Sequence, residues 1–304
     1  MSSIIINILG TTAGVPTEQR AHSATTLTYL GGSRSDLLFD CGEGTQRQML
    51  RAGFNMMKLG AVFLTHWHGD HCLGVPGLLD TLGFEGRTDP LYVCAPEARR
   101  IKRCLSFSHS MAEFPVKQVA VSTSSPRPAV VMDREDHMVV SVPVEHSVPA
   151  VAYAFIEKDR LNIDPGKSAE FGLPPEGRVY SELKEKGEVV SDGAKISLER
   201  ISTLKKGRRI VYSGDTRVCS ALEDLVEGAD LLIQDCTYFH EQSEYRPHAH
   251  ACLPEILEMV KTRGVKRTLL THISRKHRDM AELEDIVGEY PDIQVARDLM
   301  RVEL

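Results

Sequence analysis

The chain of 304 residues, 42% of them hydrophobic, can fill the core of one large or two small domains, so its composition argues against disorder. Its 36 basic and 42 acidic residues give a net charge of −6, which excludes a generic polycation that coats nucleic acid or anionic membranes. No apolar run reaches the roughly 18 residues of a membrane span. The start lacks a signal-peptide pattern, and the seven cysteines form no Cys-x-x-Cys pair. We therefore expect a cytoplasmic protein without a membrane segment.

Short runs of β-branched residues predict strands at 4–9, 25–30, 37–39, 61–64, 91–93, 138–142, 151–156, 210–212, 231–233 and 268–270. Helix-sized segments lie between many of them, at 45–52, 96–105, 220–226, 253–263 and 280–289. Because strands and helices alternate throughout the chain, the pattern predicts an α/β protein.

The segment 157–192 departs from this alternation. It is rich in glycine, proline and charged residues and poor in apolar periodicity, which is typical of a long insertion. Most such insertions are floppy surface loops, and a functional arm is the alternative.

A cluster of potential metal ligands directly follows the apolar run 61–64. His66, His68, Asp70 and His71 fall within six residues of one another. Residues two apart share a side of an extended segment, so His66 and His68 can bind one metal ion while Asp70 and His71 bind a neighbouring one. Imidazole with carboxylate favours zinc, and ligand type alone leaves manganese and iron open.

Two ions need more ligands than these four. His146, Asp215 and His272 each stand just beyond a predicted strand, where a ligand is expected. A carboxylate can bridge two ions through its two oxygens, which makes Asp215 the candidate bridge.

These residues resemble the metallo-β-lactamase superfamily, whose signature is His66-x-His68-x-Asp70-His71 here. Within it, two segments resemble the ribonuclease Z group of transfer-RNA 3′ processing endonucleases: 9–16 (LGTTAGVP) and 39–46 (FDCGEGTQ). The resemblance implies one domain over 1–304 with a four-layer αββα sandwich. It also implies that 157–192 is a protruding transfer-RNA binding arm, in which Lys184 belongs to a glycine- and lysine-containing segment.

The same resemblance implies two zinc ions per chain. One ion would be held by His66, His68, His146 and Asp215, and the other by Asp70, His71, Asp215 and His272. Asp40 would organise the surrounding loops rather than bind metal. The implied reaction is removal of the 3′ trailer of precursor tRNA, by attack of metal-bound hydroxide on a phosphodiester. The family also implies a homodimer in which the arm of one subunit holds substrate for the other.

Beside Asp70, the expected catalytic residues are His250 and Asp235. His250 occupies the position of the family's proton donor, and His248 competes with it for that role. Asp235 stands where relatives have a glutamate that supports proton transfer, and a helix or turn cap is its alternative role.

The sequence departs from the family pattern at two positions. Ala251 and Cys252 follow His250, where relatives have serine or threonine. The loop that senses the mature CCA end of tRNA often reads Pro-x-Lys-x-Arg-Asn, but residues 16–21 read PTEQRA, which places Glu18 where a cation is usual. We expect weakened discrimination against CCA-ended tRNA.

Contacts to RNA must come from local basic clusters, at 99–103, 205–209 and 275–278. The last cluster follows His272, so Arg275 and Lys276 are the preferred phosphate contacts. Two other functions stay open: a different hydrolase of the same fold, acting on general phosphodiesters, esters or lactones, and an RNA-binding protein with weakened catalysis.

Overall fold

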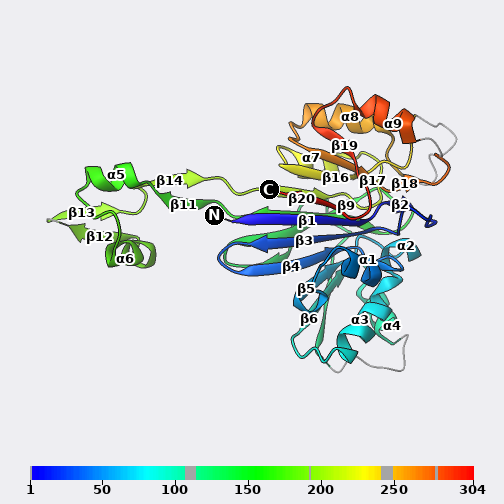
Figure 1. Ribbon diagram of the computed structural model, residues 1–304, viewed down its shortest axis with the longest axis horizontal. Coiled ribbons are helices and arrows are strands. Elements are labelled where there is room, and N and C mark those ends of the chain that lie inside the picture. The colour runs from blue at the N-terminus through cyan, green and yellow to red at the C-terminus, as the bar shows by residue number, and fades with distance from the viewer. Residues whose placement is uncertain (1, 107–113, 192, 241–248, 278–279) are drawn as a thin grey trace. The chain divides into compact units, whose positions relative to one another are not determined.

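The computed structural model describes residues 2–106, 114–191, 193–240, 249–277 and 280–304. They form two compact units, of which the larger combines Met1–Ile156 with Arg209–Leu304 and the smaller is Glu157–Arg208. Figure 1 shows the elements of both units along the chain.

The first sheet of the larger unit has seven strands, in the order β20 (Met300–Glu303), β1 (Ser3–Gly10), β3 (Ala24–Leu30), β4 (Arg34–Phe39), β5 (Leu59–Phe63), β6 (Leu91–Ala95) and β7 (Val116–Ala120). Neighbouring strands are antiparallel from β20 to β4 and parallel from β4 to β7.

The second sheet also has seven strands, in the order β19 (Ile293–Val295), β17 (Thr268–Thr271), β16 (Leu231–Asp235), β15 (Arg209–Tyr212), β10 (Ala150–Glu157), β9 (His137–Val144) and β8 (Ala129–Asp133). The strands from β19 to β15 are parallel, and β10 pairs antiparallel with β15. Its buried strands are rich in apolar residues on both faces, as expected for a sheet covered on both sides.

The core consists of three apolar layers. Side chains such as Ile6 and Phe63 of the first sheet pack between the sheets against Phe155 and Ile233 of the second. The outer face of the first sheet packs on α1 (Thr45–Arg51), α3 (Gly74–Phe84) and α4 (Ala98–Leu105). The outer face of the second packs on α7 (Ser220–Val226), α8 (Leu253–Thr262) and α9 (Met280–Val287). The predicted four-layer αββα sandwich is thereby confirmed (Figure 1).

Short elements connect these layers near the predicted ligands. They are β2 (Thr12–Ala13), α2 (Gly69–Cys72) and β18 (Ile273–Ser274). The 3₁₀ turn η1 (Met56–Lys58) precedes β5, at the end of the strand opposite the ligand loop. Strands β2 and β18 pair in parallel, so the start of the chain lies beside the segment that follows His272.

The smaller unit has its own secondary structure and core. It contains β11 (Arg160–Ile163), α5 (Pro165–Glu170), α6 (Arg178–Lys186), β12 (Glu188–Ser191), β13 (Ala194–Ser197) and β14 (Ser202–Lys205). Leu173, Leu183 and Ile196 are buried in it. The unit runs beyond 192 to Arg208, because β14 pairs with β11 and closes it. The segment therefore has regular secondary structure and a buried apolar cluster of its own.

All ten predicted strands and five predicted helices are present, with ends shifted by a few residues. Among the described helices, none combines the length and apolar character needed to cross a bilayer.

Candidate metal centre

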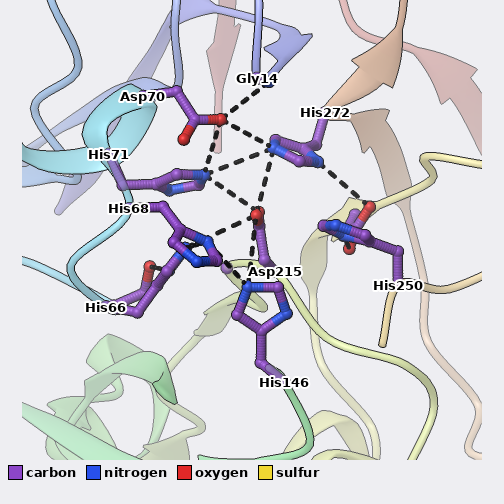
Figure 2. A network of polar contacts seen from close by, with 12 residues as sticks. Gly14, His66, His68, Asp70, His71, His146, Asp215, His250 and His272 are labelled. Atoms are coloured by element: carbon purple, nitrogen blue, oxygen red, sulfur yellow. Dashed lines mark hydrogen bonds and ion pairs between the residues drawn. The ribbon is translucent and has the colours of Figure 1, made fainter. Parts of the chain in front are cut away.

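The seven predicted ligands come from loops that follow strands of both sheets. Loop 65–71 follows β5 of the first sheet, while His146, Asp215 and His272 follow β9, β15 and β17 of the second. Two contacts join the sheets behind the loop: Tyr153 donates its hydroxyl to Leu64 O at 2.8 Å, and Val151 N donates to Thr65 O at 3.0 Å. Rigid strands of both sheets thus present the side chains to one another (Figure 2).

The first group of ligands consists of His66, His68, His146 and Asp215, whose ligand atoms all lie within 4.8 Å of one another. Nδ1 of His68 lies 3.0 Å from Nε2 of His66 and 3.1 Å from Nε2 of His146. Oδ2 of Asp215 lies 3.7 Å from Nε2 of His66. Three ring nitrogens and a carboxylate oxygen therefore surround one point.

The second group consists of Asp70, His71, His272 and again Asp215. Nε2 of His71 lies 3.1 Å from Oδ1 of Asp215, and Nε2 of His272 lies 3.2 Å from its Oδ2. Oδ2 of Asp70 lies 3.4 Å from Nε2 of His272. Asp215 is the residue that both groups share, as expected of a bridging carboxylate.

Hydrogen bonds on the far side of three histidine rings keep a proton on Nδ1. Asp40 Oδ2, a pure acceptor, lies 2.7 Å from Nδ1 of His71. The Thr65 hydroxyl donates to Asp40 and lies 3.0 Å from Nδ1 of His66. The Thr237 hydroxyl, which lies 2.6 Å from Asp235 Oδ1, is 2.9 Å from Nδ1 of His272. When these three rings are neutral, the free lone pair is therefore on Nε2, which faces the site.

This arrangement fits divalent cations. The lone pairs of His71 and His272 face carboxylate oxygens, which are also acceptors, so these atoms repel one another unless a cation or a proton lies between them. Apart from Nε2 of His71 at 3.1 Å, the buried Oδ1 of Asp215 has no hydrogen-bond partner among the described residues. Imidazole nitrogens and carboxylate oxygens are ligands for zinc, and the donor set suits two ions.

The pKa values of the histidines are shifted in opposite directions in the two ligand groups. Burial lowers the pKa of His66 and lowers that of His146 to about 4, so both rings stay neutral at pH 7. Burial also opposes the charging of His71 and His272, but the negative charge of Asp215 outweighs it. The pKa of His71 lies well above its usual value, and that of His272 is raised to about 10.

Asp40 connects the two sheets beneath the ligands. It is fully buried and accepts hydrogen bonds from Thr65 N at 2.8 Å and from the Tyr212 hydroxyl at 3.0 Å, in addition to its contact with His71. It contacts loops that carry the ligand groups and belongs to neither group.

His250 and Asp235 form a pair beside the second group. Nδ1 of His250 lies 2.8 Å from Oδ2 of Asp235, and its ring stacks on that of His272 with centroids 5.2 Å apart. Burial opposes protonation of His250, but the negative charge of Asp235 raises its pKa. Asp235 also accepts from Thr237 N at 3.0 Å, so it is both a turn cap and the partner of His250. His248 lies outside the described residues.

Backbone strain is concentrated at this site. Among the described residues other than glycine, Asp40, Ala249 and His272 have φ of 55°, 49° and 56°, a left-handed conformation that is costly for residues with a Cβ. Gly214 has φ 59°, and a Cβ there would lie 2.6 Å from Thr65 Cγ2. Strained conformations that persist commonly mark functional positions.

The predicted RNA-binding residues do not lie among the ligands. Arg275 and Lys276 are exposed and directly follow β18, three and four positions after His272. Lys184 is exposed on α6 of the smaller unit. Arg278 of the same basic cluster lies outside the described residues.

Several contacts at the centre were not predicted. They are the hydroxyl groups of Thr65, Thr237 and Tyr212 and the backbone N–H of Gly14, which donates to Oδ2 of Asp70 at 2.8 Å (Figure 2). The position of Thr65 directly before His66 is the one signal that could have indicated such a role. The others reach the site through pairing of distant strands.

Sequence comparisons agree with this architecture. Residues 22–161 match a family model of the metallo-beta-lactamase superfamily, and residues 193–273 match one described as a beta-lactamase superfamily domain. The chain is 38% identical over 305 residues to the ribonuclease Z of Methanosarcina acetivorans, covering 98% of this chain and 97% of the relative. It is 35% identical over 310 residues to the ribonuclease Z of Gemmatimonas aurantiaca, covering 99% and 96%.

Solved structures share the fold. The short form of human tRNase Z superposes with a TM-score of 0.69 at 23% identity and covers 98% of both chains. A diphosphatase of the PhnP family superposes with a TM-score of 0.62 at 17% identity, covering 99% of this chain and 98% of its own. At these identities the likeness shows the fold alone.

Proposed function

Because this chain belongs to the ribonuclease Z family of the metallo-β-lactamase superfamily, we propose that it is a zinc-dependent endoribonuclease that removes the 3′ trailer of precursor tRNA. The observation that carries the proposal is the convergence of two ligand groups on the shared Asp215, with the His250–Asp235 pair beside them. Similarity to ribonuclease Z chains extends over nearly the full length of both partners, which favours this activity over other hydrolases of the same fold.

The residues would divide the metal-binding work between the two groups. His66, His68 and His146 would hold one zinc ion, Asp70, His71 and His272 the other, and Asp215 would bridge them. When bound there, the ions supply charge neutralisation for the phosphodiester and activation of the attacking water. The partners behind three of the rings would keep Nε2 of His66, His71 and His272 aimed at the ions.

His250 would protonate the ribose oxygen that leaves when the phosphodiester breaks. Its Nδ1 is engaged by Asp235, so Nε2 is the atom available for proton transfer. The raised pKa of His250 favours the protonated form that a general acid requires. Asp235 would orient the ring and stabilise its charge.

Binding of the RNA backbone would involve Arg275 and Lys276 near the metal centre and Lys184 in the smaller unit. We propose that this unit, residues 157–208, is the tRNA-binding arm and that the protein works as a homodimer in the cytoplasm. All seven cysteines are free thiols, which suits a reducing compartment.

The test is to incubate zinc-loaded protein with a 3′-extended precursor tRNA and to map both product ends, with Asp215→Ala as the control. The proposal expects one cut near the discriminator nucleotide that is absent with Asp215→Ala. Activity on a small phosphodiester or lactone without RNA cleavage would indicate a different hydrolase. Tight RNA binding without either activity would indicate a binding protein.

A further inference from the structure

Asp298 binds both ends of a loop that reaches the metal centre. It lies between β19 and β20 and belongs to neither group of metal ligands. Its Oδ1 accepts from the Thr11 hydroxyl at 2.7 Å, and its Oδ2 accepts from Ala21 N at 2.7 Å. Gln48 Nε2 also donates to Oδ2 at 3.0 Å. One carboxylate thus holds the first and last residues of the 11–21 loop.

Contacts of the loop backbone support the same closure. Thr11 N and Thr12 N donate to Ala21 O at 3.0 and 3.1 Å. The guanidinium group of Arg20 donates to the Thr11 hydroxyl at 2.7 Å and to Ala296 O at 3.3 Å. Thr11 is fully buried, so a lost partner there cannot readily be replaced by solvent.

The loop then contacts the segments that carry two ligands of one metal group. Gly14 N donates to Oδ2 of Asp70 at 2.8 Å, as Figure 2 shows. Ile273 N, directly after His272, donates to Thr11 O at 2.9 Å, and β2 pairs with β18. Among the described residues, the loop makes no comparable hydrogen bond with the side chains of His66, His68 or His146. Its influence should therefore be confined to the side of Asp70, His71 and His272.

The conformation of the chain next to Asp298 is strained. Leu299 has φ 65°, the largest positive value among the described residues other than glycine, and its N–H donates to Ile8 O at 2.7 Å. Three of the other four such residues are Asp40, Ala249 and His272, at the metal centre. Strain that recurs around a site indicates that the local geometry is held for function.

We propose that Asp298 is a positioning residue that fixes the carboxylate of Asp70 through the 11–21 loop and so raises the affinity of the Asp70, His71 and His272 side for its ion. The proposal rests on the proposed function only in taking these residues as a metal site. No RNA is needed for its test.

The experiment measures zinc binding by equilibrium dialysis in two backgrounds. His68→Ala leaves the Asp70 side intact, and His71→Ala leaves the His66 side intact. Asp298→Asn keeps the size of the side chain but turns one acceptor oxygen into a donor, opposite the donors it binds. In the His68→Ala background, we expect Asp298→Asn to weaken zinc binding about tenfold, which is the lower end of the effect of residues that orient metal ligands. In the His71→Ala background, we expect the same substitution to weaken zinc binding less than twofold.

The matched control is Glu284→Gln, which makes the same chemical change. Glu284 shares with Asp298 the wall of a cavity of about 600 Å³ but pairs with Arg297, at 2.8 Å. Glu284→Gln should leave the zinc affinity unchanged in both the His68→Ala and the His71→Ala backgrounds. Circular dichroism shows whether Asp298→Asn folds. If it folds poorly, Thr11→Val replaces it in the same experiment, because this substitution removes one donor to Asp298.

Equal weakening in both backgrounds, or no weakening in either, would overturn the proposal, because a general structural role affects both sides alike. These outcomes are independent of the nuclease reaction. Selective weakening of zinc binding together with an absence of tRNA cleavage by the wild type would uphold the role of Asp298 and reject the proposed function.

Discussion

Nδ1 of His250 lies 2.8 Å from Oδ2 of Asp235, and Asp235 is itself buried and held by Thr216 N and Thr237 N. The carboxylate therefore has a fixed position from which it orients the ring. We expect His250→Ala to lower the rate of tRNA cleavage by about 10²- to 10⁴-fold, the usual contribution of a positioned general acid. Single-turnover kinetics with saturating enzyme measure this rate without interference from product release.

The zinc content of His250→Ala should equal that of the wild type, since the two groups that would hold the ions are complete without His250, although His250 also clusters with Asp215, Asp235 and His272. His240→Ala is the matched control, because His240 is exposed and pairs with Glu282, away from both ligand groups. Full activity of His250→Ala, with loss of activity in His248→Ala, would transfer the role of proton donor to His248.

Asp40→Asn should weaken zinc binding about 10- to 100-fold, because an amide does not favour the Nδ1 proton of His71 as a carboxylate does. Its amino group would also oppose the donors Thr65 and Tyr212, which should lower the free energy of unfolding by about 1–3 kcal/mol. Zinc titration and thermal denaturation measure the two effects separately.

Asp36→Asn is the control for Asp40→Asn. Asp36 is also buried, but it pairs with Thr28 and Arg34, away from the ligands. It should lower stability and leave zinc affinity unchanged. Equal zinc affinity in Asp40→Asn and the wild type would contradict the role given to Asp40.

The fold was predictable where strands are long and buried. Runs such as 4–9 and 151–156 are apolar on both faces and lie in the covered sheets. The helix α3 was missed, because its sequence GVPGLLDTLGF contains three glycines and a proline, and tertiary packing of Leu78 and Leu82 compensates for this low propensity. The edge strands β7 and β8 are short and partly exposed, so their apolar pattern is weak.

The clustering of the seven candidate ligands was predictable because histidine and aspartate stand just beyond strands, where side chains from different strands meet. Their partners were not. Thr237 lies 35 positions before His272, and Tyr212 lies 172 positions after Asp40, so only the folded sheets bring them together. Asp298 was not predicted either, because its contacts depend on β20 joining the sheet beside β1.

Zinc binding at pH 7 should release about two protons from histidine rings, one each from His71 and His272, because the raised pKa of each ring keeps it protonated without metal. A proton lost by the water that the ions activate would add to this number. Zinc competes with these protons, so the affinity of the protein for zinc should rise with pH as long as the pH is below the raised pKa values of the two rings. The pKa of His272 is raised to about 10. Calorimetry in buffers of different ionisation enthalpy measures the release. In His272→Ala the number should fall by about one. Heats that do not depend on the buffer would contradict the prediction.

Lys276→Ala should weaken tRNA binding and lower the slope of log affinity against log salt by about 1, as expected for the loss of one phosphate contact. Filter binding at several salt concentrations, with the catalytically inactive Asp215→Ala background, gives both quantities. Lys261→Ala removes the same charge from an exposed position of α8 and should change neither the affinity nor the slope. An unchanged slope in Lys276→Ala would remove this residue from the RNA-binding surface.

The last prediction concerns Glu18, whose side chain is exposed on the 11–21 loop. The neighbouring cation cannot take its place, because the Arg20 guanidinium is turned inward to Thr11 and Ala296 O. The charge that the loop presents to an RNA phosphate is therefore negative. We expect kcat/KM for CCA-ended and CCA-less precursors to differ by less than about tenfold, and Glu18→Lys to increase that difference by tightening contact with the CCA phosphates. Glu85→Lys, at the exposed end of α3, makes the same charge change and should leave the ratio as it is. The prediction would be contradicted if the wild type left CCA-ended tRNA strongly protected from cleavage and if added salt did not reduce this protection. Discrimination would then not depend on charge at this position.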